Sequence, residues 1–437
     1  MRKQLLLGWL LTFSFIASYS QALPLREQAG VINSILEERL NSVLPGVMVK
    51  NGIDCWIVMS REYNEDPVLR TMLPAEWLNA RRRTIFVFYN NPVTGDFEKL
   101  AIARYNVGGR IKAAWDTQRW PDQWDALINL LTTRNPRHIA IDSSADFGAA
   151  DGLDHTDFME LERHLPPAYR ERIISAQPLA VGWLETRSPM EMELYPRLID
   201  FTHGIIAEAF SANVIVPGVT STEDVEWWLR QRIRDKGFDT WFHPSVDIQR
   251  EDSPSHIILP GDLLHVDFGI TYLRLNTDVQ EHAYVLKQGE TSAPASIRAA
   301  FARAGRLQDI LTSQFAEGRT GNQILASALA EAKKEGIQAS IYTHPIGYHG
   351  HGAGPAIGLW DHQEGVPGSG DFPMHQKTAY SIELNARSEI PEWHKTVRIM
   401  LEEDGYFGEG GFRYIHGRQT DIYLIPRNNM DGKEITY

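Results

Sequence analysis

The chain has 437 residues, of which 43% are hydrophobic and 23% are charged, as in an ordinary soluble globular protein of about two domains. Its formal net charge of −13 argues against a nucleic-acid partner, because such a partner requires a basic face. The single cysteine, Cys55, excludes a disulfide within the chain, and its apolar flanks predict a buried core residue.

The first 22 residues have the features of a secretory signal peptide. Arg2 and Lys3 form a basic start, residues 5–17 are mainly apolar, and residues 20–22 form a small-x-Ala cleavage site. A retained membrane anchor is the alternative, but the apolar run is short for a bilayer span. With cleavage and without disulfides, the sequence predicts a bacterial periplasmic or secreted protein with no membrane segment after processing.

The next segment, residues 23–182, is expected to form an α/β domain. Short apolar runs of strand length alternate there with helix-like segments, which is the pattern of an α/β layer. The helix-like segments are residues 31–46 and 120–135. The strand-like runs are DCWIVM, TIFVFYN, KLAIARY and HIAIDSS.

A second domain is expected over residues 183–437. Two capping boxes predict helix starts, one formed by Ser188 with Glu191 and the other by Ser221 with Asp224. In each box the serine side chain accepts a hydrogen bond from the backbone N–H group of the acid, and the acid side chain accepts one from the backbone N–H group of the serine.

The later part of this second domain combines one helix pair with many strand-like runs. Pro196 lies inside the first of its capped helices and should kink or break that helix. A further helix pair is expected over residues 293–336, with its break at Gly318. Because the segments from residue 239 onward are mostly strand-like, we expect an α+β domain with helices covering one face of a mainly antiparallel sheet.

Two acids stand 11 residues apart in LLHVDFGITYLRLNTDVQEHAYV, namely Asp267 and Asp278. Each lies in a β-branched or aromatic run, where a carboxylate is costly to bury without a partner. A turn at Gly269 would form a hairpin and bring the two carboxylates together, where a metal cation would neutralise them. The alternative is a pair of solvated turn acids.

Three further elements strengthen the metal interpretation. A Gly/His cluster, THPIGYHGHGAG, carries His344, His349 and His351, and its glycines permit close approach of the backbone to a ligand. Glu383 and Glu402 stand at the ends of strand-like runs in SIEL and VRIMLEED. A flexible loop without an ion and salt-bridged edge acids are the alternatives for each element alone, so the interpretation depends on the whole set.

This set resembles the M24-type metallopeptidase family of methionine aminopeptidase, aminopeptidase P and prolidase, which have the pita-bread fold. The family pattern is a D-x-G strand, a second Asp 11 residues later, a G-H-x-x-G element and one Glu on each of two later strands. The preceding half resembles the creatinase-type N-terminal domain of aminopeptidase P and prolidase. The matching ligand residues in this chain are Asp267, Asp278, His351, Glu383 and Glu402.

The resemblance implies two divalent ions, of Mn²⁺, Co²⁺, Zn²⁺ or Fe²⁺, that share a bridging hydroxide. By resemblance, Asp278 and Glu402 bridge the ions, and Glu383 also acts as a general base. The resemblance also gives catalytic roles to three histidines, which would orient the substrate and assist proton transfer: His256, His344 and His362.

The histidine loop departs from the family pattern. His344 and His362 are 18 residues apart, more than in the usual motif, so either His349 or His351 is the metal ligand. We prefer His351 because glycines flank it. The Glu-Pro-Gly that usually follows the first Glu is Glu383-Leu384-Asn385 here, and Met400 replaces a common Arg. These differences bear on substrate specificity more than on metal binding.

The function implied is that of an aminopeptidase that hydrolyses the N-terminal Xaa-Pro bond of short peptides or Xaa-Pro dipeptides, and by analogy a homo-oligomer. Methionine aminopeptidase itself fits less well, because it usually lacks the N-terminal domain. Two alternatives remain open at this stage. One is another enzyme on the same fold, such as a C–N hydrolase or a metal-dependent lyase. The other is a non-catalytic binding protein on a peptidase scaffold.

Overall fold

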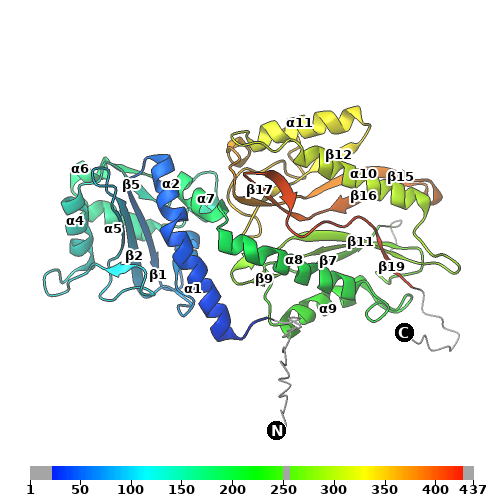
Figure 1. Ribbon diagram of the computed structural model, residues 1–437, viewed down its shortest axis with the longest axis horizontal. Coiled ribbons are helices and arrows are strands. Elements are labelled where there is room, and N and C mark those ends of the chain that lie inside the picture. Colours follow the sequence, from blue (N-terminus) through cyan, green and yellow to red (C-terminus); the bar gives the residue numbers. More distant parts are fainter. Residues whose placement is uncertain (1–21, 250–255, 427–437) are drawn as a thin grey trace, which may run out of the picture.

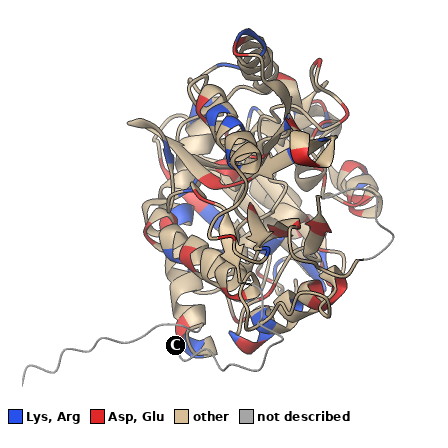
Figure 2. Ribbon diagram, turned by 90° about the vertical axis from the view of Figure 1, so that its right-hand side faces the viewer, with Lys and Arg blue, Asp and Glu red and all other residues tan. Residues whose placement is uncertain are grey.

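The computed structural model describes residues 22–249 and 256–426 of the chain. The predicted signal peptide lies outside the described residues, apart from its last residue, Ala22. Among the helices of the described part, none is both long and apolar enough to cross a membrane. Acidic and basic residues are interspersed over the face that Figure 2 presents.

The N-terminal half is built on a six-stranded mixed sheet of order β4-β3-β2-β1-β5-β6, seen at the left of Figure 1. β1 pairs antiparallel with β2 and parallel with β5. Its strands are β1 (Cys55–Arg61), β2 (Arg83–Asn90), β3 (Phe97–Ala101), β4 (Lys112–Ala113), β5 (Ile139–Ile141) and β6 (Ile173–Ser175). Its helices are α1 (Leu25–Asn41), α2 (Val43–Asn51), α3 (Pro67–Met72), α4 (Gln123–Arg134), α5 (His155–His164), α6 (Pro167–Arg170) and α7 (Gln177–Glu185), with a 3₁₀ turn at Gly148–Ala150.

Helices cover both faces of this sheet because its central strands are apolar on both sides. Alternate residues of a strand point to opposite faces. Trp56 and Val58 of β1 pack in one core cluster with α1, α2 and α7. Cys55 and Ile57 pack in the other with α4 and α5, so the predicted burial of Cys55 is confirmed.

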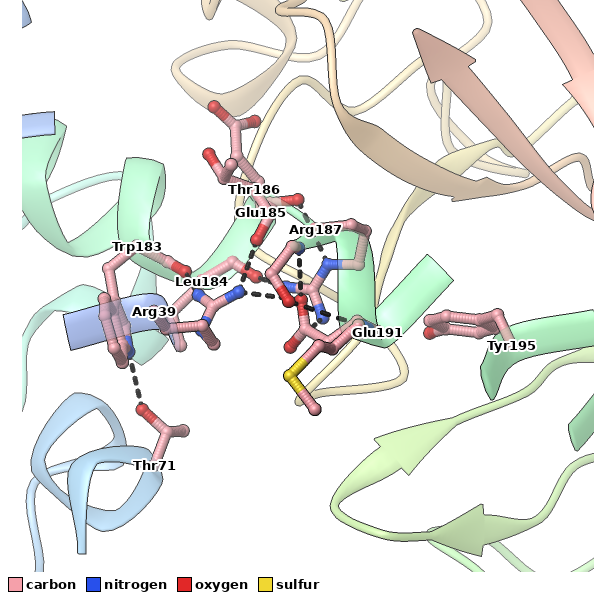
Figure 3. A network of polar contacts seen from close by, with 12 residues as sticks. Arg39, Thr71, Trp183, Leu184, Glu185, Thr186, Arg187, Glu191 and Tyr195 are labelled. Carbon is pink, nitrogen blue, oxygen red and sulfur yellow. Dashed lines mark hydrogen bonds and ion pairs between the residues drawn. The ribbon is translucent and has the colours of Figure 1, made fainter. Parts of the chain in front are cut away.

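A buried ionic network joins the two halves of the chain where α7 is followed by α8 (Pro189–Ala209). Arg39 of α1 donates from Nη1 to Glu191 Oε2 at 2.8 Å and to the carbonyl oxygen of Thr186 at 2.6 Å. Arg187 approaches the other Glu191 oxygen at 3.4 Å, and all three charged side chains are fully buried. Figure 3 shows the two arginines converging with Glu191. The junction is therefore held by charges that water does not screen.

The C-terminal half contains several small, mainly antiparallel sheets, of orders β19-β11-β8-β7, β13-β14-β17-β18, β12-β15-β16 and β10-β9. β11 and β19 form the parallel exception. The strands are β7 (Ser245–Ile248), β8 (Leu263–Phe268), β9 (Thr271–Tyr272), β10 (Leu275–Asn276), β11 (Val279–Val285), β12 (Gln338–Ile341), β13 (His344–Ile346), β14 (Thr378–Ser381), β15 (Leu384–Ile390), β16 (Lys395–Leu401), β17 (Asp404–Gly408), β18 (Gly411–Tyr414) and β19 (Tyr423–Ile425), with 3₁₀ turns at Ser369–Asp371 and Pro391–Trp393.

Two helix pairs flank these strands (Figure 1). The first pair, α8 and α9 (Thr222–Asp235), packs on β7, β8 and β11, and the second, α10 (Ala295–Thr312) and α11 (Gly321–Lys334), packs on β12, β15 and β16. The capping boxes at Ser188 and Ser221 are both formed.

Pro196 does not break α8, contrary to one of the two outcomes expected for it, because the helix is continuous from Pro189 to Ala209. A proline inside a helix costs about 3 kcal/mol or more. Burial of the flanking Tyr195 and Ile199, each fully inside the core, offsets that cost at about 1.5–3 kcal/mol per side chain.

Candidate metal centre

A hairpin brings the two aspartates together, as their spacing predicts. β8 carries Asp267 and pairs antiparallel with β11, which begins just after Asp278. Gly269 is needed at the bend, because a Cβ atom there would lie 2.1 Å from the carbonyl oxygen of Thr277. Asp278 is anchored by its backbone N–H group, which donates to Asp404 Oδ2 at 3.2 Å.

Two glutamates from other strands face the aspartates. Glu383 lies between β14 and β15, and Glu402 follows β16. Gln280 of β11 links them, since its Nε2 donates to Glu402 Oε2 at 2.6 Å and to Glu383 Oε1 at 3.0 Å. Ser381 donates its hydroxyl to the other oxygen of Glu402. A short polar network therefore fixes the orientation of both glutamates.

His344 is the histidine that lies among these acids. It begins β13 opposite Ser381 of β14. Its Nε2 lies 3.8 Å from Asp278 Oδ2 and 3.9 Å from Glu402 Oε1, and this buried atom has no hydrogen-bond partner among the described residues. Its Nδ1 lies 3.1 Å from the carbonyl oxygen of Pro345, which fixes the ring.

His351 lies beside His344, at the exposed edge of the cluster. The two imidazole rings are 4.7 Å apart in a T-shaped arrangement. Trp241 and Tyr342 approach the His351 ring at 5.2 Å and 5.7 Å. Gly350 permits this packing, because a Cβ atom there would lie 2.3 Å from the Trp241 ring. His351 is thus the one histidine of the loop that both borders the acids and faces solvent.

The acids strongly perturb one another. Burial, and then the charge of Asp267, raises the pKa of Asp278 well above its usual range, and burial followed by the Asp278 charge does the same to Glu402. Burial raises the pKa of Asp267 to about 6, and burial with the Asp267 charge raises that of Glu383 to about 8. Four carboxyl groups this close cannot all ionise without a cation.

The donor set fits divalent metal ions. Among the described residues, one oxygen each of Asp267, Asp278 and Glu402 lie within 4.8 Å of one another. His344 forms a group of the same size with Glu383 and Glu402, and another with Asp278 and His351. Burial lowers the pKa of His344 to about 3, so its imidazole is neutral, as a metal ligand requires. Asp267 Oδ1 is also buried without a partner, as expected of a ligand atom.

Three histidines singled out in the sequence lie outside these groups, insofar as the described residues show. His349 packs near Arg187, whose charge adds to burial in lowering the pKa of His349. His362 is exposed, with Nδ1 3.4 Å from Glu364 Oε1. His256 is exposed next to residues 250–255, which are not described.

Sequence reasoning missed Gln280, Trp241 and Tyr342. Gln280 had a usable signal, because it stands two residues after Asp278 and therefore on the same face of an extended strand. The resemblance gives His344 a catalytic role, but the sequence also carries a signal for its binding a metal, since His344-Pro345-Ile346-Gly347 has the H-x-x-G spacing of the family element. Trp241 and Tyr342 had none, because their contacts arise only from the path of the loop.

The sequence profile of Metallopeptidase family M24 matches residues 198–413. Curated proteins give no significant match. A solved X-Pro aminopeptidase from Thermotoga maritima is similar with a TM-score of 0.61 at 17% identity, covering 85% of this chain and 98% of that one. A Xaa-Pro dipeptidase from Bacillus anthracis gives a TM-score of 0.56 at 15% identity, covering 90% and 99%. A prolidase from Pyrococcus furiosus gives 0.54 at 14% identity, covering 86% and 100%.

These likenesses extend over both halves of the chain, so the predicted fold class is confirmed: an α/β N-terminal domain followed by an α+β pita-bread domain. The acids and histidines described above lie within the profile match. The chain therefore belongs to metallopeptidase family M24, and it is a hydrolytic enzyme.

Proposed function

We propose that this enzyme is an aminopeptidase with two divalent metal ions that hydrolyses the bond between an N-terminal residue and proline in short peptides. One observation carries the proposal: four carboxyl groups, two buried and two half-buried, converge with His344, and two of the facing atoms, Asp267 Oδ1 and His344 Nε2, have no partner within the described residues. Such atoms are costly to bury unless a ligand satisfies them.

The proposed ligands are Asp267, Asp278, His344, Glu383 and Glu402. His344 takes the place that the sequence suggested for His351, because its unpartnered Nε2 faces Asp278 and Glu402 directly. When bound, the ions lower the pKa of a coordinated water and polarise the substrate carbonyl. Oxygen ligands with one imidazole suit Mn²⁺, Co²⁺, Zn²⁺ and Fe²⁺.

The remaining side chains supply orientation and proton transfer. Glu383 borders the metal cluster, where its carboxylate can accept a proton from water and return it to the leaving amine. His351 stands beside the ligand cluster and is exposed, so it can donate a hydrogen bond to a substrate carbonyl or to the developing oxyanion. Gln280 holds both glutamates in place.

Support for the Xaa-Pro substrate comes from the solved structures named X-Pro aminopeptidase, Xaa-Pro dipeptidase and prolidase, all at 17% identity or less. Asn385 and Met400 depart from the usual motif beside the two glutamates and bear on specificity more than on metal binding. We further propose a periplasmic or secreted homo-oligomer, on the strength of the N-terminal sequence and of analogy with the family.

The test is a hydrolysis assay on the purified mature enzyme. It uses Ala-Pro and Ala-Pro-Gly, with Ala-Ala-Gly and Pro-Ala-Gly as matched controls, in the presence of Mn²⁺, Co²⁺, Zn²⁺ or Fe²⁺. Metal-dependent cleavage of the two proline peptides is expected. Metal binding with cleavage of none of the four peptides would remove the Xaa-Pro assignment and favour another C–N hydrolase or lyase on this fold.

A further inference from the structure

The strand segment that holds the metal centre carries a second group of ionisable side chains on its opposite face. Gln280 and Glu402 form an antiparallel bridge and face the metal centre. Glu281 and Glu403 come next in each segment, and adjacent residues of extended backbone point to opposite sides. The two carboxyl groups of this second pair therefore lie behind the metal centre, on the side covered by α8.

His203 of α8 completes this group. Its Nε2 lies 2.9 Å from Glu403 Oε2, while the other Glu403 oxygen accepts from the backbone N–H group of Gln419 at 2.8 Å. Glu281 and Glu403 are only 2% and 1% exposed. One ligand atom each of His203, Glu281 and Glu403 lie within 4.8 Å of one another. We call these three residues the back-face cluster.

Glu281 is only partly satisfied by the protein, although the Tyr423 side chain contacts its carboxyl group. Its Oε2 is buried and has no hydrogen-bond partner among the described residues. His203 contacts Glu403 and leaves the Oε2 atom of Glu281 without a partner among the described residues. Two carboxylates and a neutral imidazole carry two negative charges, which one divalent cation balances.

We propose that the back-face cluster binds one divalent transition-metal ion, separate from the catalytic ions. An imidazole nitrogen and carboxylate oxygens are ligands that Zn²⁺ accepts, with water completing a tetrahedral site. Tetrahedral Zn²⁺ with bonds of about 2.1 Å holds its ligand atoms about 3.4 Å apart. The 2.9 Å between His203 and Glu403 therefore needs to open by only a few tenths of an ångström.

The ion has a route to the site and a structural effect once there. The His203 side chain is 19% exposed, so solvent reaches the cluster from the α8 side. Bound metal would tie α8, β11 and the segment after β16 together. It would also hold Gln419, whose side chain bonds both backbone groups of His282 in β11. We therefore assign the site a stabilising role and no role in the chemistry.

The proposal is tested by counting metal in the full mature protein after equilibration with Zn²⁺ and removal of free metal. Glu281→Gln and His203→Ala should each bind one Zn²⁺ fewer per chain than the wild type. His416→Ala is the matched control, because its ring lies only 6.2 Å from His203 but outside the cluster, and it should keep the full number. Zn²⁺ should also raise the thermal midpoint less in the two cluster variants than in the control.

The same substitution in a protein with a weakened catalytic centre distinguishes metal bound at the back-face cluster from metal bound at the catalytic centre. Asp278→Asn weakens the catalytic centre, and adding Glu281→Gln to it should still remove one further Zn²⁺. An unchanged metal count in Glu281→Gln and in His203→Ala, in either background, would overturn the proposal. His203 is partly exposed, so His203→Ala remains informative if Glu281→Gln does not fold.

Discussion

His344 Nε2 lies 3.8 Å from Asp278 Oδ2, too far for a hydrogen bond and close enough for both atoms to bind one ion. His351 stands beside them at the exposed edge, and His349 packs toward Arg187 instead. The three histidines of one short loop therefore have three different environments. Their substitution should separate a metal ligand, a substrate-facing group and a packing residue.

His344→Ala should lose metal affinity by more than about 100-fold, since even outer partners of metal ligands typically cost about 10- to 100-fold. His351→Ala should keep its metal and lose about 10²- to 10⁴-fold in kcat/KM, the usual contribution of a proton-transfer or orienting group. His349→Ala serves as the control and should retain both. Metal content by mass spectrometry and peptide hydrolysis distinguish the three. Full metal retention in His344→Ala would show that another histidine is the ligand.

Gln280→Leu should weaken metal binding about 10- to 100-fold, because Gln280 positions Glu383 and Glu402 through one amide nitrogen. Isothermal titration with Mn²⁺ measures the effect. The control is the thermal midpoint of the metal-free variant, which should stay close to that of the metal-free wild type. Leucine removes the amide donor to the two glutamates without opening a cavity. Wild-type affinity in this variant would mean that the glutamates are oriented by their strands alone.

Glu191→Gln should destabilise the protein by about 3–5 kcal/mol, because it leaves Arg39 and Arg187 buried without their carboxylate. The control is Arg306→Ala. It breaks an ion pair with Glu335 whose side chains are 51% and 33% exposed, so the change should have little effect on stability. Urea unfolding compares the two. Equal effects would show that the junction between the halves does not depend on this network.

Asp142→Asn should stabilise the N-terminal half at neutral pH. Burial, with the charge of Asp66, raises the pKa of Asp142 well above its usual range, and burial raises that of Asp66 to about 6. A carboxyl group whose pKa is raised by folding contributes its full stability below the unfolded pKa of about 3.9. That contribution is lost as the pH rises through the folded pKa.

The asparagine removes this pH-dependent loss and still accepts the hydrogen bond from Trp56 Nε1. The variant should therefore match the wild type near pH 4 and have the higher thermal midpoint at pH 8. Asp125→Asn, at an exposed site in α4, should show no such pH dependence. A gain at pH 4 equal to that at pH 8 would exclude the ionisation as its cause.

Local sequence patterns predicted the parts of the fold that local chemistry determines. The capping boxes at Ser188 and Ser221 form because an acid three residues after a Ser can satisfy free N–H groups without help from distant segments. The approach of Asp267 and Asp278 follows in the same way from the antiparallel pairing of β8 with β11. Whether Pro196 breaks its helix could not be predicted from local sequence, because burial of the residues around it decides whether the helix continues.

The histidine loop could not be resolved from sequence because its glycines leave the backbone path open. Which imidazole enters the acid cluster depends on the pairing of β13 with β14, a contact between segments more than 30 residues apart. Gly352 shows the constraint, since a Cβ atom there would lie 2.6 Å from the carbonyl oxygen of Pro345. The tight turn after β13 buries His344 and leaves His351 at the edge.

The most direct measurement is the metal content and Ala-Pro-Gly hydrolysis of Asp278→Asn beside the wild type, with circular dichroism as a check on folding. Asp278 is one of the proposed metal ligands, so replacing its carboxylate with an amide should lower the bound metal and abolish hydrolysis while the fold persists. A folded Asp278→Asn variant that binds metal and cleaves the peptide as the wild type does would contradict the account.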